Sequence, residues 1–108
     1  ISFTQGMIKG YNTVFDQGDG SQKRTLNISS TNDIGTGHLH YNHTNNYVAT
    51  SGYVQMPNDT SSATKGFITN PVGGSEAPTT SLAQSNLYNT SYSLVDGKHS
   101  TAFGGELA

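Results

Sequence analysis

The sequence YNTVFDQGDGSQKRTLNIS, residues 11–29, decides the fold class of this chain. Its two ends, residues 11–15 and 23–29, contain Thr, Tyr, Phe, Val, Leu and Ile, which favour β-strands. Between them, residues 17–21 contain an Asp-Gly step, which is typical of tight hairpin turns. Two strand-like segments joined by such a turn predict an antiparallel β-hairpin.

The same succession of short strand-like segments and turns continues along the chain. Residues 30–33 and 96–97 are expected to form turns, and the irregular stretch 72–85 is expected to be a loop. The best helical candidate is one or two turns over residues 81–87. With the two segments of the hairpin, strands are expected at 2–8, 36–42, 47–56, 63–69, 87–95 and 99–107.

About eight short strands joined by tight turns predict an all-β protein, with residues 1–108 as one domain. The first expectation is an eight-stranded antiparallel up-and-down (meander) β-barrel, because closing a meander removes its exposed edges. The alternative is a β-sandwich. No repeat of 20–50 residues is present, which argues against a solenoid or a propeller.

Composition excludes several classes of function. The net charge is -2 and the five cations are dispersed, so no basic surface for nucleic acid is predicted. No apolar run approaches the roughly 18 residues of a membrane span. The chain has no Cys, which fits a cytosolic protein, a bacterial surface or secreted protein, or a phage structural protein. The abundance of Ser, Thr and Asn over charged residues favours the last two.

The sequence GHLHYNH, residues 37–43, holds three of the four histidines. Side chains alternate along a strand, so His38 and His40 are expected on one face, about 7 Å apart. Imidazole is a common metal ligand, and His99 from a neighbouring strand would add a third. The predicted metal ligands are therefore His38, His40 and His99. The Glu that a cupin-like site requires does not follow.

Haem is a second possible ligand of this segment, because both His and Tyr can hold haem iron. The candidate haem-binding residues are His38, His40, Tyr41 and His43. A simpler interpretation also accounts for the spacing: Leu39 and Tyr41 point inward, and the histidines lie on a polar outer face without any ligand. Three possibilities thus remain open, namely haem, a transition metal such as zinc, and no cofactor.

Catalysis is not expected. Ser is abundant, but no G-x-S-x-G motif is present. The two glutamates, Glu76 and Glu106, lie in an expected loop and at the chain end. Each Asp lies at or beside a turn, where shaping the backbone is its usual role. The sequence therefore predicts a binding or structural protein rather than an enzyme.

The closing phrase AFGGELA, residues 102–108, together with the Gly-, Thr- and Asn-rich meander, supports a family resemblance. The chain resembles the C-terminal β-barrel of Gram-negative surface lipoproteins of the transferrin-binding protein B type and related haemophores. The resemblance implies a bacterial protein, either secreted or lipid-anchored at the cell surface, that captures haem or iron from a host protein. The competing hypothesis is a structural or adhesive β-module, such as part of a phage tail or a surface adhesin, with no cofactor.

Overall fold

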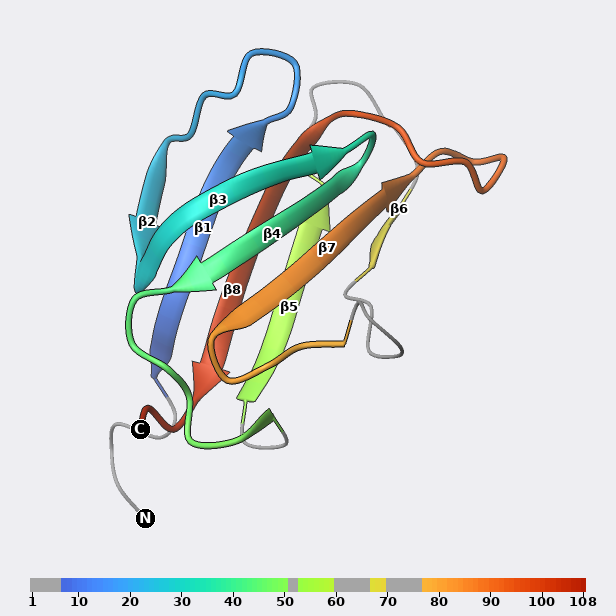
Figure 1. Ribbon diagram of the computed structural model, residues 1–108. Helices are drawn as coiled ribbons and strands as arrows, with labels where there is room; N and C mark the ends of the chain where they lie inside the picture. The colour runs from blue at the N-terminus through green and yellow to red at the C-terminus, as the bar shows by residue number, and fades with distance from the viewer. Residues whose placement is uncertain (1–6, 51–52, 60–66, 70–76) are drawn as a thin grey trace.

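A computed structural model describes residues 7–50, 53–59, 67–69 and 77–108 of the chain. These residues form an all-β protein whose strands lie in two antiparallel sheets of four strands each. Sheet A has the order β2-β1-β8-β5 and sheet B the order β3-β4-β7-β6 (Figure 1). The strands are β1 (Ile8–Asp16), β2 (Arg24–Leu26), β3 (Ile28–Gly35), β4 (His38–His43), β5 (Tyr53–Asp59), β6 (Phe67–Thr69), β7 (Leu82–Tyr88) and β8 (Lys98–Gly105).

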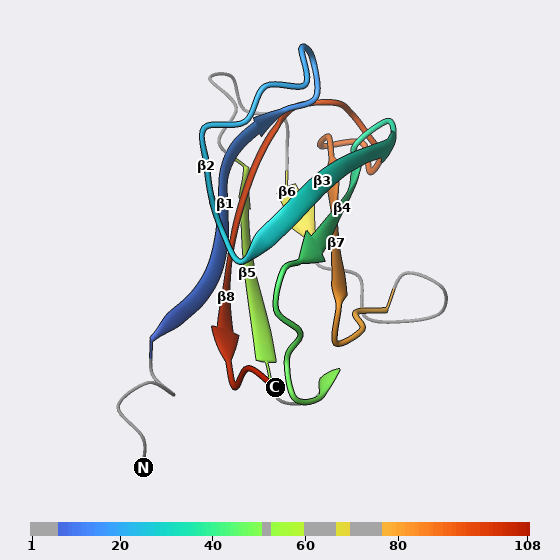
Figure 2. The ribbon, with the colours of Figure 1, turned by 60° about the vertical axis from the view of Figure 1, so that its left-hand side comes forward.

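The predicted barrel is wrong, and the arrangement fits the β-sandwich alternative. Figure 2 shows β1, β8 and β5 in one layer and β3, β4 and β7 in the other. The chain changes layers at Asn27, the single residue between β2 and β3, whose φ of 57° turns the backbone. The Asn27 side chain holds this corner, accepting from Asn45 N at 2.7 Å and donating to Asn45 O at 3.0 Å. Because β2 and β3 lie in different sheets, the meander does not close.

Several local predictions also need correction. The hairpin of β1 and β2 is confirmed, but residues 30–33 belong to β3 instead of a turn. Of the expected loop 72–85, residues 82–85 belong to β7, residues 77–81 lie outside regular strands as expected, and residues 72–76 lie outside the described residues. The short helix expected at 81–87 is wrong, because residues 82–87 belong to β7. Most of the expected strand 87–95 lies outside regular strands. The expected strand 47–56 is displaced to Tyr53–Asp59. Most of the expected strand 2–8, and residues 63–66, lie outside the described residues.

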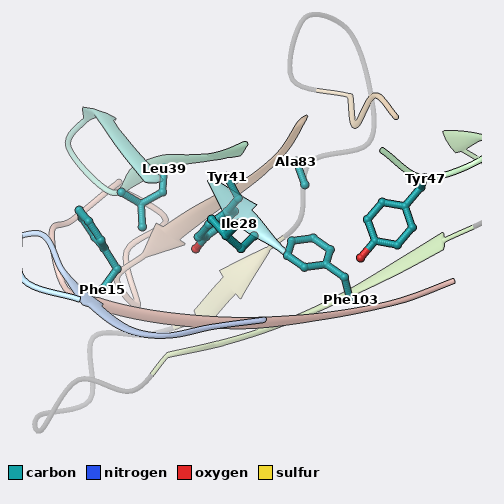
Figure 3. Packing of buried hydrophobic residues seen from close by; sticks show 7 residues of the cluster. All are labelled: Phe15, Ile28, Leu39, Tyr41, Tyr47, Ala83 and Phe103. Carbon is teal, nitrogen blue, oxygen red and sulfur yellow. The ribbon is translucent and has the colours of Figure 1, made fainter. Parts of the chain in front are cut away.

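The core lies between the two sheets, where alternate side chains of β4 and β8 point toward each other. Both strands bury every second residue, as a strand with one inward face requires. Figure 3 shows the resulting cluster, with Phe15 and Leu39 at one end and Tyr47 at the other. Each such large side chain contributes roughly 1.5–3 kcal/mol by leaving water. The cluster comprises Phe15, Ile28, Leu39, Tyr41, Tyr47, Ala83 and Phe103.

Gly37 aligns the histidine-bearing strand β4 with the loop after β7. Its φ is 71°, which a glycine adopts without strain. Its N–H donates to Asp96 Oδ1 at 3.0 Å, and its carbonyl accepts from Leu87 N at 2.8 Å. A Cβ atom at this position would lie only 2.7 Å from Leu87 O and 2.8 Å from Val95 O. The turn before β4 therefore requires glycine for both conformation and space.

Candidate functional site

His38 and His40 lie on the outer face of sheet B, as the alternation of the strand predicts. Strand β4 buries Leu39, Tyr41 and His43, while His38 and His40, which alternate with them, are half-buried. The two imidazole rings meet edge to face, with centroids 5.3 Å apart and planes at 79°. They form one pair of imidazoles on a single surface, which we call the outer histidine pair.

Polar side chains flank the outer histidine pair. His40 is aligned with Asn32 of β3 and with Gln84 of β7. His38 Nε2 lies 2.6 Å from Gln84 Oε1, and because an amide oxygen only accepts, this ring nitrogen donates. In the described part of the chain, no group of three or more His, Cys, Asp or Glu side chains is placed to hold a metal ion. The pair thus offers two imidazoles, where a protein zinc site has three or four protein ligands.

The other predicted ligands lie in the interior, away from this outer face. Tyr41 and His43 point from β4 into the space between the sheets, and His99 points into the same space from β8. The predicted metal ligands are therefore divided between an outer face and the core. The predicted haem ligands are divided in the same way, two outside and two inside.

His43 sits in an aromatic cluster. Its ring centroid lies 4.9 Å from that of Tyr47, 5.6 Å from that of Tyr53 and 4.8 Å from that of Phe103, each at 80–89°. Neither ring nitrogen has a hydrogen-bond partner among the described residues. Burial lowers the pKa of His43 from its usual 6.5 to about 4, because a charged imidazolium is poorly solvated among aromatic rings. The side chain is therefore neutral at neutral pH.

His99 lies in a chain of hydrogen bonds that crosses the core. Tyr41 Oη lies 2.8 Å from Ser85 Oγ, and Ser85 Oγ lies 3.1 Å from His99 Nδ1. On the other side of the ring, His99 Nε2 lies 2.7 Å from Gln17 Oε1. The Gln17 amide nitrogen then donates to Asp33 Oδ1 at 3.2 Å. The chain joins side chains from both sheets.

The acceptor at one end of this chain, Asp33, and the neutral state of His99 together determine which atom donates in each bond. Gln17 donates through its nitrogen to Asp33, so its oxygen accepts and His99 Nε2 carries a proton. Burial lowers the pKa of His99 to about 4, partly offset by nearby carboxylates, so the ring is neutral and Nδ1 accepts. Ser85 therefore donates to His99, and Tyr41 donates to Ser85. Burial also raises the pKa of Tyr41 well above its usual value, which keeps this first donor protonated.

The contact between Ser85 and His99 has the geometry of a nucleophile and its base, but a structural role explains it. Both side chains are fully buried, and Ser85 Oγ is already hydrogen-bonded to Tyr41. Hydrogen bonding of this kind is what buried polar groups require in a folded core. Sequence reasoning missed both Ser85 and Gln17, because it placed the first in a loop and the second in a turn, and no motif marks either residue.

The outer face of sheet A carries a second feature that the sequence did not reveal. The register aligns Leu26, Tyr11, Ala102 and Met56 in one row across the four strands. A second row aligns Ile8, Gly104 and Val54. The large aliphatic side chains of both rows are exposed: Ile8 48%, Leu26 45%, Val54 60% and Met56 46%. We call these seven residues the apolar face.

Comparison with protein-family models, with curated proteins and with solved structures found no match to this chain. Within the described residues, no helix is long and apolar enough to cross a membrane.

Proposed function

We propose that this chain is a structural or adhesive β-module that works through contact between its sheet surface and another protein surface, without catalysis. The apolar face of sheet A is the observation that carries this proposal. Four large aliphatic side chains, each 45–60% exposed, lie in two register rows on this face, with Tyr11, Ala102 and Gly104 between them. Contiguous exposed apolar surface of this kind marks protein contact sites, because leaving it in water is costly.

The roles of the interior histidines support this proposal. His99 joins a hydrogen-bonded chain, and His43 packs among aromatic rings. Each is accounted for by the packing of the sandwich. The two interior histidines therefore have structural explanations, whereas the apolar face has none within the described part of the chain.

The second candidate function is capture of haem or a transition metal by a bacterial surface or secreted protein. The outer histidine pair favours it, because two imidazoles with centroids 5.3 Å apart share one half-buried surface. In this candidate, His38 and His40 bind haem iron or zinc, and the source is a host haem or iron protein.

Titration with hemin and with Zn²⁺ separates the two functions. The structural module is expected to give no saturable Soret shift and no saturable zinc binding. His38→Ala and His40→Ala remove the outer pair, and Asn42→Ala is the matched control on the same face of β4. Saturable binding that is lost in both histidine variants and kept in Asn42→Ala would establish the second candidate and overturn the first.

A positive test probes the apolar face itself. The native chain is expected to bind the hydrophobic dye ANS at neutral pH, and Met56→Lys is expected to weaken that binding while the far-UV circular dichroism stays unchanged. Equal dye binding by both proteins would remove the observation on which the structural module rests.

A further inference from the structure

We propose that the apolar face of sheet A binds a second copy of this chain, face to face, around a twofold axis that runs along the strands between β1 and β8. This inference rests on the proposed function and names the partner. It follows from the order in which large, small and charged residues lie across the four strands.

Large residues of the apolar face lie next to small ones. On β1, Tyr11 is aligned with Ala102 of β8, and Ile8 is aligned with Gly104. The outer surface is therefore raised over β1 and low over β8. Such a step between neighbouring strands does not pack closely against a flat surface.

A twofold axis between β1 and β8 makes the two surfaces complementary, because the raised strand of one copy then lies over the low strand of the other. It places β1 of one copy over β8 of its partner, so that Tyr11 meets Ala102 and Ile8 meets Gly104, each pair twice. At the sheet edges it places Leu26 of β2 over Met56 of β5, which joins two exposed aliphatic side chains. An interface around a twofold axis must be self-complementary in this way. The order of large and small residues across the sheet meets that requirement.

The charges at the end of the same two strands agree with this axis. Asp16 of β1 is aligned with Lys98 of β8. Both residues precede or follow inward-facing neighbours, Phe15 and His99, so they lie on the outer side of the sheet. The proposed axis places Asp16 of each copy opposite Lys98 of its partner, which juxtaposes opposite charges. The small net charge of -2 also leaves little overall repulsion between two copies.

The row of Tyr11 and Ala102 is the best place to test the register. Packed sheets cross at about 30°, so alignment holds best near the centre and less well toward the strand ends. The inner and outer sides of these two positions are settled by their buried neighbours, Asn12 and Phe103. Substitutions at Tyr11 and Ala102 therefore change the outer surface and leave the core intact.

The decisive experiment mixes two variants that each oppose self-association. Tyr11→Lys places a lysine over Ala102 of the partner, and Ala102→Glu places a glutamate over Tyr11. Each variant alone is expected to be monomeric in analytical ultracentrifugation at concentrations where the wild type is a dimer. An equimolar mixture is expected to form a heterodimer, because the introduced lysine of one copy then faces the introduced glutamate of the other. A mixture that stays monomeric would contradict the proposed axis.

A second pair of variants adds the same charged side chain to two different faces, so that the comparison tests the position of the contact. A Cβ at Gly104 meets only Val54 Cγ2 at 3.9 Å, and one at Gly35 meets nothing within 4 Å among the described residues. Both positions therefore accept a side chain within one copy. Gly104→Arg is expected to weaken association at least about tenfold, because it fills the space for Ile8 of the partner, whereas Gly35→Arg on sheet B is the control and leaves association unchanged.

Two further outcomes would overturn the proposal, and neither depends on the titrations above. A wild-type chain that remains monomeric up to about 1 mM would exclude a specific dimer. A dimer that Gly104→Arg leaves intact would place the contact on another face. If the dimer fails while hemin and zinc still do not bind, the structural module stands with a different partner. If hemin binds saturably through the outer histidine pair, the structural module fails whatever the association state.

Discussion

The interior of the sandwich buries two neutral histidines in opposite ways. His99 is fully hydrogen-bonded, with Ser85 on one ring nitrogen and Gln17 on the other. Within the described residues, His43 has no hydrogen-bond partner on either nitrogen and is enclosed by Tyr47, Tyr53 and Phe103. Burial lowers the pKa of both to about 4. The same residue type therefore belongs to a polar network at one end of the core and to an aromatic cluster at the other.

The difference shows that burial and hydrogen bonding have separate consequences. Burial determines the charge state, since a low-polarity surrounding disfavours the imidazolium whatever the partners are. Hydrogen bonds determine what is lost when the ring is removed, since a buried donor or acceptor left without a partner costs about 1–3 kcal/mol. Both ends should therefore respond alike to acid and differently to substitution.

Lowering the pH should cause a large loss of folding stability, and it should act at both ends of the core. The unfolded chain protonates each histidine near pH 6.5, while the folded chain resists protonation until about pH 4. Stability is thus retained above pH 6.5 and falls as the pH drops from 6.5 toward 4. Lowering the pH from 7 to 5 should cost about 2 kcal/mol per histidine, or about 4 kcal/mol together. Urea denaturation at the two pH values measures this loss.

Single variants divide the acid effect between the two ends. His43→Leu and His99→Leu should each remove about half of the loss of stability between pH 7 and pH 5. If both variants keep the full loss, carboxylates or other groups cause it, and the assignment to the buried histidines is wrong.

Phe103→Ala should lower the stability by a similar amount, and it should do so by disrupting the aromatic end alone. Its ring contacts Tyr41, His43, Tyr47 and Tyr53, and it is fully buried. Removing a buried Phe leaves a cavity and lowers the free energy of unfolding by about 3–5 kcal/mol. Phe103→Leu is the matched control and should lose clearly less. A loss under about 1 kcal/mol for the alanine variant would mean that the cluster is not the packed centre of this end.

The two histidine-to-leucine variants should differ at neutral pH. His99→Leu removes the acceptor of the buried Ser85 hydroxyl proton and one of the two donors to the Gln17 oxygen, which still accepts from Gly97 N at 3.3 Å. We therefore expect a loss of about 1–3 kcal/mol. His43→Leu removes two nitrogens that have no partners among the described residues, so the change should stay within about 1 kcal/mol. Thermal and urea unfolding at pH 7.5, where both rings are neutral, compares them. Equal losses would contradict the distinction between the two ends.

The substitution with the smallest expected loss of stability, Tyr41→Phe, tests which groups donate in the hydrogen-bonded chain. Tyr41 is its terminal donor, so Tyr41→Phe removes one bond and leaves only an unused lone pair on Ser85. We expect a loss of about 1 kcal/mol from Tyr41→Phe. Ser85→Ala should lower the stability more, because it leaves both the Tyr41 hydroxyl and His99 Nδ1 without their hydrogen-bond partner. Nitrogen NMR of the His99 ring should show a protonated Nε2 and an unprotonated Nδ1; the opposite tautomer would reverse the inferred order of donors.

Local patterns in the sequence predicted the parts of the fold that depend on near neighbours. The Asp-Gly step predicted the hairpin of β1 and β2, and the alternation around Leu39 predicted the side of β4 that His38 and His40 take. The inward position of His43 was not predicted. The pattern failed at β7, whose sequence LAQSNLY has no β-branched residue and looked like a loop. This segment is a strand because β4 and β6 bond to it on both sides, and those partners are distant in sequence.

The candidate sites could be predicted only in part, for the same reason. That His38 and His40 share a face follows from a spacing of two residues. That His99 joins Ser85 and Gln17 depends on three segments meeting in space, and no local signal indicates it. The apolar face was also hidden, because its rows run across four strands while the sequence runs along them.

The sequence by itself determined the all-β class, the first hairpin and the shared face of His38 and His40, because these follow from residue preferences and the period of a strand. Tertiary structure alone decided that the sheets stay open, since one backbone corner at Asn27 sends β2 and β3 into different layers. It also decided which histidine is hydrogen-bonded, which is enclosed by rings and which pair remains outside. These outcomes depend on pairing between distant segments, and a one-dimensional pattern does not specify that pairing.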